Sequence, residues 1–151
     1  LVYDTQYDPD TFETVLYVPV STVYKDTDIS FSPNITAAST ILFTPLTNLS
    51  FGLISKYVGK QYLDNTQTDS KSIDAYLVNN VNLSYKWKPT WIGEIAFNVL
   101  VNNIFDGKYV SNGYTYSYYY RPSGSSDPAT TENFYYPQAG VNFLTGITLK
   151  F

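Results

Sequence analysis

The sequence contains no histidine, no cysteine and no methionine among its 151 residues. Without histidine and cysteine, the chain cannot build a Ser-His-Asp triad, a cysteine nucleophile or a typical zinc site. Disulfide bonds are also excluded, which rules out the disulfide-rich class of small secreted domains. Three carboxylates, Asp64, Asp69 and Asp74, share one polar stretch, but their spacing specifies neither a calcium site nor an acid–base pair. We therefore expect no enzyme activity, no metal and no cofactor.

Charged residues are scarce. They make up 15% of the chain, against about 25% in an average soluble domain, and nine basic residues against thirteen acidic ones give a net charge of −4. This acidic balance predicts that the chain binds no nucleic acid. Aromatic residues reach 18%, and sixteen of them are tyrosine. Few charges combined with many aromatic rings suit a surface that meets a lipid interface or sugars.

Long apolar runs are missing as well. No stretch of about 18 apolar residues could span a membrane as a helix, and no signal peptide is recognisable. The chain starts at Leu1 rather than at methionine, so we expect it to be a piece of a longer protein. Any contact with a membrane is then expected from strands.

Apolar and polar residues alternate with a period of two in five segments, as in strands with one apolar face. The first alternation runs for about sixteen residues, where strands of soluble sheets usually have five or six. The five segments are residues 29–44, 49–57, 77–87, 95–102 and 141–151.

The connections between these segments alternate in length. Those near Pro45–Asn48 and Lys88–Thr90 are short, whereas residues 59–72 and 106–133 form long ones. Short periplasmic turns and long extracellular loops are typical of outer-membrane barrels. The sequence therefore predicts an all-β fold, namely an antiparallel transmembrane β-barrel segment of about five long strands within a larger barrel. The alternative is a soluble β-sandwich, against which the strand lengths argue.

Charges and aromatic rings fit the barrel prediction. The strand charges Lys56, Lys86, Glu94 and Lys150 all fall on the polar side of the alternation. A lysine or arginine facing lipid near the bilayer centre would cost roughly 2–4 kcal/mol. Aromatic rings gather at both ends of the segments and predict two interfacial girdles. The girdle residues are Phe43, Trp87 and Trp91 at the short-turn end and Tyr57 and Tyr136 toward the long-loop end.

Two motifs carry a family resemblance. The first is Asn103, Ile104 and Phe105 followed by Lys108 and Tyr109. The second is the Tyr-Pro-x-x-Gly-x-x-Phe pattern of Tyr136, Pro137, Gly140 and Phe143. Together they resemble the closing strands of a TonB-dependent outer-membrane receptor. Two positions depart from the family pattern: Ile104 replaces the commoner leucine, and Val141 stands where the family commonly has arginine, whose role therefore does not transfer.

The resemblance implies a role in transport. Such receptors are twenty-two-stranded barrels with an N-terminal plug in the outer membrane of Gram-negative bacteria. The C-terminal end of this sequence resembles that of receptors from Bacteroidetes. They import a scarce large solute, such as an iron-siderophore, a cobalamin-like corrinoid or an oligosaccharide, with energy from the inner membrane. Residues 29–151 would supply the C-terminal barrel strands and residues 1–28 an extracellular loop region. The implied partners are the plug and upstream strands of the same receptor, outer-membrane lipid, the barrel-assembly machinery, and TonB through the missing N-terminal region.

The last strand resembles the signal that the barrel-assembly machinery reads. Its aromatic end and alternate side chains could add to an exposed sheet edge, main chain to main chain. The residues of this expected signal are Phe143, Thr145, Ile147, Leu149 and Phe151. The alternative is that Phe151 is simply a girdle residue.

One loop is rich in tyrosine, which offers a flat apolar ring and a hydroxyl at low entropy cost. We expect this loop to contact the ligand. Because part of the run alternates, it could instead extend the barrel wall as a hairpin. The candidate ligand-contact residues are Tyr114, Tyr116, Tyr118, Tyr119, Tyr120 and Arg121.

Two other functions stay open. One is a passive outer-membrane porin or adhesin, and the other is a soluble secreted β-domain that binds sugar. Five strands cannot close a barrel, for which about eight is the smallest common number. If the barrel prediction holds, the chain alone should form a curved open sheet with two bare edges.

Overall fold

The computed structural model describes residues 2–7, 14–20, 23–118 and 130–151, the first two ranges by their backbone alone. Every regular element in these ranges is a β-strand. No helix among the described residues has the length and apolar character needed to cross a membrane.

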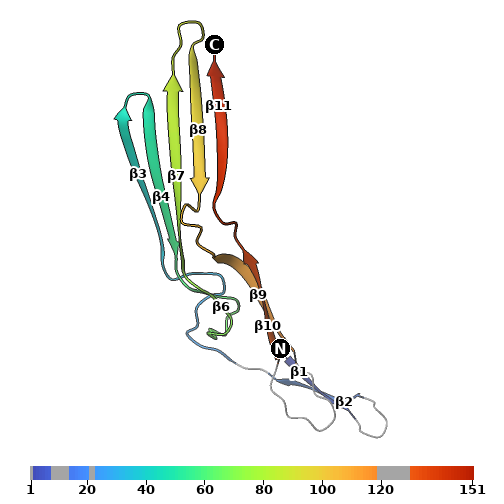
Figure 1. The fold of residues 1–151 in the computed structure, drawn as a ribbon. Helices are drawn as coiled ribbons and strands as arrows, with labels where there is room; N and C mark the ends of the chain where they lie inside the picture. The colour runs from blue at the N-terminus through green and yellow to red at the C-terminus, as the bar shows by residue number, and fades with distance from the viewer. Residues whose placement is uncertain (1, 8–13, 21–22, 119–129) are drawn as a thin grey trace.

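Five long strands form one antiparallel sheet in the order β11-β8-β7-β4-β3. Each strand pairs with its neighbour in that order, so the sheet is a meander interrupted by two long connections (Figure 1). β3 and β11 each pair on one side only, so the described strands form an open sheet and no closed barrel. The strands are β3 (Thr36–Leu46), β4 (Leu49–Val58), β7 (Tyr76–Trp87), β8 (Glu94–Asn102) and β11 (Asn142–Lys150).

Three strand pairs lie outside this sheet. β1 (Val2–Tyr7) pairs with β2 (Thr14–Val20) within the predicted N-terminal loop region. β5 (Gln61–Tyr62) and β6 (Ser72–Ile73) form a two-residue pair within the connection between β4 and β7. β9 (Val110–Tyr118) and β10 (Thr130–Pro137) form a hairpin that leaves the sheet at the end opposite the short turns (Figure 1).

The predicted all-β antiparallel architecture and the open sheet are confirmed. The last four alternating segments match β4, β7, β8 and β11 to within two residues at their ends. Over its described residues, the tyrosine-rich stretch forms the hairpin β9–β10 rather than a plain loop, and this hairpin is a two-stranded sheet of its own.

The prediction for the first segment, residues 29–44, is wrong at its N-terminal end, because β3 begins only at Thr36. Phe31 has a φ of 58°, which breaks an extended backbone, and Pro33 has no N–H to give to a ladder. The Phe31 N–H donates instead to the Tyr62 carbonyl at 3.0 Å. Local turn geometry thus removes seven residues from the predicted strand.

The sheet has two chemically distinct faces. Cross-strand register places Ile41, Leu53, Val81, Val101 and Phe143 in one row, because directly paired residues point to the same side. Other rows of this apolar face contain Phe43, Phe51, Leu83 and Val99, then Leu49, Tyr85, Phe97 and Ile147, then Trp87, Ile95 and Leu149.

The opposite face is mostly polar. The strand charges Lys56, Lys86, Glu94 and Lys150 all lie on it by register, as predicted. Lys150 Nζ lies 3.0 Å from Glu94 Oε1 on the neighbouring strand. Asparagine, serine and threonine side chains fill about half of the remaining positions, and the larger apolar residues on this face are Leu42, Ile54, Val58, Val78, Leu100 and Leu144.

Very little of the apolar surface is covered. Within the described residues, the buried hydrophobic side chains are Val58, Leu63, Ile73 and Ile95. By contrast, Phe143 is 73% exposed and Ile147 is 66% exposed. A sheet of this size without a packed core needs a further apolar phase or partner to be stable in water.

Candidate functional site

The apolar face is exposed on all five strands of the described sheet. On it, the polar residues Ser55 and Asn79 face each other across β4 and β7, and the Ser55 hydroxyl donates to Asn79 Oδ1 at 2.6 Å. This bond gives the Ser55 hydroxyl an acceptor and the Asn79 side-chain oxygen a donor. A contiguous apolar surface spread over five strands marks a site of contact with lipid or with another protein.

The predicted girdle residues lie at both ends of this face, with one exception. Phe43 and Trp87 lie toward the short turns, and Trp91, which is 75% exposed, lies in the turn between β7 and β8. Tyr57 lies near the other end of β4. The exception is Tyr136, which lies in β10 and therefore outside the five-stranded sheet.

The residues that carry the family resemblance meet at one corner of the fold. There the chain leaves β8 and turns into β9, and the segment between β10 and β11 returns against it. Asn103, only 4% exposed, donates through Nδ2 to the carbonyls of Gly107 at 2.9 Å and Ala139 at 3.2 Å. Its Oδ1 accepts the Gly107 N–H at 3.0 Å. A single amide side chain thus joins both motifs.

Asp106 completes this corner. Its carboxylate accepts the Val141 N–H and pairs with Lys108 at 3.0 Å. The hydrogen bond from Val141, followed by the bond and charge of Lys108, lowers the pKa of Asp106. Gly140 packs against this carboxylate so closely that an added Cβ would clash with Asp106 Oδ1. The glycine of the second motif is therefore required by a close approach.

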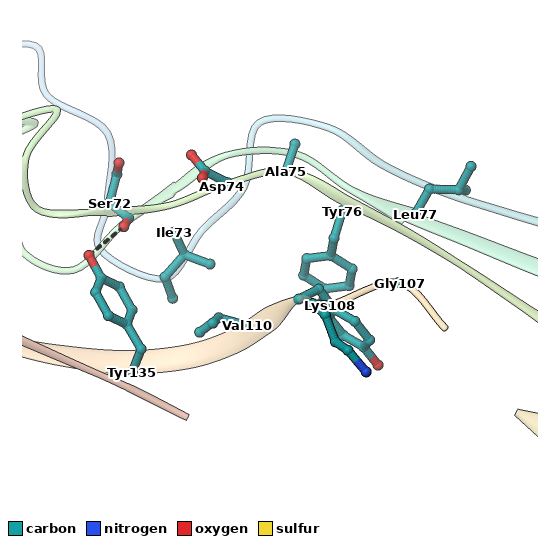
Figure 2. A pocket seen from close by; sticks show the side chains of 11 residues that line it. Ser72, Ile73, Asp74, Ala75, Tyr76, Leu77, Gly107, Lys108, Val110 and Tyr135 are labelled. Carbon is teal, nitrogen blue, oxygen red and sulfur yellow. Dashed lines mark hydrogen bonds between the residues drawn. The ribbon is translucent and has the colours of Figure 1, made fainter. Parts of the chain in front are cut away.

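Tyr109, the last residue of the first motif, stacks on Tyr76 at the start of β7. The ring centroids are 4.6 Å apart with an angle of 30° between the planes. Figure 2 shows the ring of Tyr76 next to Lys108. This stack joins the beginning of the β9–β10 hairpin to the end of the five-stranded sheet. Phe105, in contrast, is 75% exposed and contributes no stack among the described rings.

One face of the β9–β10 hairpin is a continuous row of aromatic rings, which we call the aromatic ladder. Tyr114 and Phe134 face each other across the two strands, with centroids 4.9 Å apart and planes 13° apart. Tyr116 and then Tyr118 extend the row on one side, and Tyr136 extends it on the other. All five rings are partly exposed, so the ladder offers ring edges and hydroxyls to solvent.

Glu132 lies beside the ladder and affects the ionisation of Tyr116. It is paired by register with Tyr116, and the Tyr118 hydroxyl donates to Glu132 Oε1 at 3.4 Å. Loss of hydration, followed by the nearby Glu132 charge, raises the pKa of Tyr116. The Tyr116 hydroxyl therefore stays protonated and able to donate.

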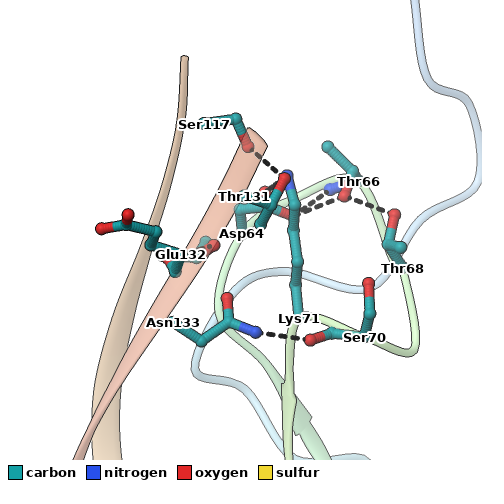
Figure 3. A network of polar contacts seen from close by, with 10 residues as sticks. Asp64, Thr66, Thr68, Ser70, Lys71, Ser117, Thr131, Glu132 and Asn133 are labelled. Carbon is teal, nitrogen blue, oxygen red and sulfur yellow. Dashed lines mark hydrogen bonds and ion pairs between the residues drawn. The ribbon is translucent and has the colours of Figure 1, made fainter. Parts of the chain in front are cut away.

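The opposite face of the hairpin packs on the connection between β4 and β7 (Figure 3). Asn133 Nδ2 donates to the Ser70 carbonyl at 2.6 Å, and the Tyr135 hydroxyl donates to the Ser72 carbonyl at 3.1 Å. Gly113 lies next to Leu63, whose Cδ2 would be 3.3 Å from an added Cβ. The hairpin is thus anchored on one face and exposed on the other.

Two carboxylates of that connection, Asp64 and Asp69, have partners within it. Asp64 accepts bonds from Thr66 and pairs with Lys71 at 2.9 Å. Burial acts to raise the pKa of Asp64, but the bonds from Thr66 and Lys71 outweigh it, so the pKa is lowered. Asp69 pairs with Lys60 at 2.5 Å. Within the described residues, no three acidic side chains gather as metal ligands would.

The terminal strand lies at a free edge of the sheet. Phe143, Thr145, Ile147 and Leu149 all lie on the apolar face of β11, in register with β8. Phe151 follows the strand and is 98% exposed. The pattern expected of an assembly signal is therefore presented on an edge strand with one side unpaired.

Half of the candidate ligand-contact residues come together. Tyr114, Tyr116 and Tyr118 share the aromatic ladder, whereas Tyr119, Tyr120 and Arg121 lie outside the described residues. The sequence interpretation missed Phe134 and Asp106. No local pattern indicates that Phe134 faces Tyr114 or that Asp106 binds Val141.

Comparisons of the chain with models of protein families, with curated proteins and with solved structures give no match.

Proposed function

We propose that this chain is the C-terminal barrel wall of a TonB-dependent outer-membrane receptor. The observation that carries the proposal is the apolar face of the five-stranded sheet, which is exposed over its whole width and has aromatic rings at both ends. A bilayer would cover this face, and the two interfaces would hold the rings.

The height of the face supports this proposal. From Trp87 to Leu77, β7 runs for ten residue steps, which is roughly 33 Å at about 3.3 Å per residue. With a strand tilt of about 40°, this gives a height of roughly 25 Å, which is the height of the apolar band in outer-membrane barrels. Trp87 then lies at one interface, and Tyr57, paired with Leu77, lies at the other.

The polar face fits the lumen of such a barrel. Lys56, Lys86, Glu94 and Lys150 would meet water there rather than lipid. Moving one of these lysines to the lipid side near the bilayer centre would cost roughly 2–4 kcal/mol. The open edges of β3 and β11 would pair with further strands of a larger barrel.

The corner built by Asn103, Asp106 and Gly140 favours a receptor over a passive porin. Asn103 and Gly140 belong to the two motifs that resemble the TonB-dependent family, and Asp106 lies between the matched residues of the first motif. The contacts of these three residues hold the two motifs together. The soluble sugar-binding domain is disfavoured, because the few buried apolar side chains among the residues with described burial form no core there.

Under this proposal, the receptor imports a scarce large solute, such as an iron-siderophore, a corrinoid or an oligosaccharide. TonB would deliver energy through the plug region of the complete receptor. β11 would be read by the barrel-assembly machinery, and the β9–β10 hairpin would stand on the extracellular side.

The test uses the complete protein in its own bacterium. Uptake of a ferric siderophore, cobalamin and a set of oligosaccharides is measured with and without a functional TonB. The proposal expects one solute to be taken up only when the gene and TonB are both intact. Uptake that persists without TonB would identify a passive porin instead, and recovery of the folded protein in the soluble fraction would overturn the membrane assignment.

A further inference from the structure

One step of β9 carries a reactive pair of residues. Asn112 is followed by Gly113, and no other asparagine of the sequence precedes a glycine. An asparagine side chain is lost as ammonia when the main-chain nitrogen of the next residue attacks its Cγ. Glycine leaves that nitrogen unhindered because it has no Cβ. Whether the reaction takes place then depends on how the folded chain holds the two groups.

The structure holds the attacking nitrogen against its target. The Gly113 N–H donates to Asn112 Oδ1 at 2.8 Å, so the nitrogen lies next to the carboxamide that it would attack. Asn112 is exposed, and water therefore reaches this carboxamide. By register, Asn112 lies opposite Tyr136, on the same face of the hairpin as the aromatic ladder.

A β-bulge comes just before this step. Val110 pairs with Pro137 and Asn112 pairs with Tyr136, which leaves Ser111 without a residue opposite it. A bulge interrupts the ladder of main-chain hydrogen bonds and bends the strand. The main chain next to Asn112 is therefore less constrained than in a regular strand pair, and it can turn toward the five-membered ring that the reaction forms.

The fold requires the glycine that makes Asn112 reactive. A Cβ added at Gly113 would lie 2.5 Å from the Phe134 carbonyl oxygen and 3.3 Å from Leu63 Cδ2. The close approach of β9 to β10 and to the connection between β4 and β7 therefore excludes any larger residue at position 113.

The step from Asp106 to Gly107 shows the same chemistry held back. An aspartate before glycine forms the same ring with loss of water. Here the Asp106 carboxylate accepts the Val141 N–H at 2.9 Å, and the Gly107 N–H donates to Asn103 Oδ1 at 3.0 Å. The attacking nitrogen and its target are thus each bonded to another residue. The chain protects this step and leaves the step after Asn112 reactive.

We propose that Asn112 is a site of spontaneous deamidation in the folded protein. Hydroxide removes the Gly113 amide proton, and the nitrogen forms a bond to Asn112 Cγ. The side-chain nitrogen leaves as ammonia with a proton from water, which restores the hydroxide. Water then opens the succinimide at either carbonyl and gives aspartate or isoaspartate. This inference goes beyond the proposed function and does not depend on it.

The isoaspartate product changes the main chain of β9, because it adds a methylene group between Ser111 and Gly113. The added length moves Gly113 out of its close approach and Tyr114 away from its position opposite Phe134. The new carboxylate lies at the end of the aromatic ladder, beside Tyr136. Deamidation therefore loosens the β9–β10 hairpin and leaves the five-stranded sheet in place.

The test is ageing of the complete protein in detergent at mildly alkaline pH. Chymotrypsin cuts after tyrosine and releases residues 110–114, in which mass spectrometry and labelling by isoaspartyl methyltransferase measure aspartate and isoaspartate against an unaged sample. The reference is the synthetic peptide Val-Ser-Asn-Gly-Tyr. We expect the folded protein to lose the Asn112 amide at a rate within a few-fold of the peptide. Asp106 should isomerise many-fold more slowly in the folded protein than in a peptide of its own sequence.

Asn112→Gln is the matched control, because it keeps a surface amide but would have to close a slower six-membered ring. On ageing, this variant should keep its mass and the hydrogen exchange of its β9 and β10 amides, whereas those amides should exchange faster in aged wild type. Asn112→Asp carries the new charge on a normal main chain, so its hairpin should exchange more slowly than that of aged wild type.

An Asn112 amide that survives many-fold longer in the folded protein than in the peptide would overturn the inference, because the hairpin would then shield it. Equal rates of loss at Asn112 and at Asn133, which precedes phenylalanine, would also overturn it. Aged wild type that has lost the Asn112 amide but exchanges as before would refute the loosening of the hairpin.

Discussion

The Asp106 carboxylate accepts a hydrogen bond from the Val141 N–H at 2.9 Å, joining two segments 35 residues apart in the chain. This bond ties the exit of β8 to the start of β11, the two strands that pair along the free edge of the sheet. The direction in which the β9–β10 hairpin leaves the sheet is therefore fixed by side chains, not by strand pairing.

The Asp106 bond predicts a dependence of stability on pH. The pKa of Asp106 is lower in the folded protein than its ordinary value of 3.8, because of Val141 first and Lys108 second. Its contribution is therefore complete above pH 3.8 and is lost as the pH falls through the lowered value. We expect the urea midpoint of wild type to exceed that of Asp106→Asn by a constant amount from pH 7 to pH 5, and the gap to close in acid. If the difference between the two urea midpoints stayed the same in strong acid, the charge of the Asp106 carboxylate would not contribute to stability.

Asn103 is predicted to be the most sensitive residue of the corner. Asn103→Ala leaves the carbonyls of Gly107 and Ala139 without their donor and puts alanine at a φ of 50°. We expect a loss of about 2–4 kcal/mol in the free energy of unfolding, measured by urea titration. Asn103→Gly removes the same bonds but accepts the positive φ, so it should cost less. Equal losses in the two variants would show that backbone strain does not contribute.

Phe134 is predicted to hold the aromatic ladder together, since its ring contacts both Tyr114 and Tyr116. Two aromatic pairs at about 0.5–1.5 kcal/mol each give a loss of about 1–3 kcal/mol for Phe134→Ala. Hydrogen exchange of the β9 and β10 amides should speed up accordingly, while the amides of β7 and β8 stay as protected as before. Phe134→Leu should show a stability between those of the wild type and Phe134→Ala. Unchanged exchange in the hairpin would mean that the ladder adds nothing to its stability.

Deletion of Phe151 is predicted to impair assembly rather than stability. The side chain is 98% exposed, so its loss removes little packing from the folded sheet. We expect a several-fold lower level of the complete receptor in the outer membrane, and an unchanged urea midpoint for protein refolded in detergent. Unchanged outer-membrane levels would leave Phe151 as a girdle residue only.

Strand positions could be predicted from the sequence because period-two alternation directly reports a two-faced sheet. Lys56, Lys86, Glu94 and Lys150 all lie on the face that this period assigns to them. The start of β3 could not be predicted, because the alternation continues through Phe31, where a positive φ ends the extended chain.

The candidate site was only partly predictable. The tyrosines at positions 114, 116 and 118 share a face through the same period of two, and this follows from spacing alone. Phe134 joins these tyrosines through the pairing of β9 with β10. Val141 meets Asp106 through a tertiary contact. Neither relation leaves a local pattern in the sequence.

The central claim is that the apolar face of the sheet meets lipid and the polar face meets water. Val81 and Asn82 are neighbours on the central strand β7 and point to opposite faces. Because this chain has no cysteine, Val81→Cys and Asn82→Cys each introduce one thiol into it. The measurement is the labelling of each thiol in the complete protein in lipid vesicles, by a water-soluble maleimide and by a fluorophore quenched by brominated lipid. We predict lipid quenching and no aqueous labelling at Val81→Cys, and the reverse at Asn82→Cys. Equal aqueous labelling at the two positions would contradict the account.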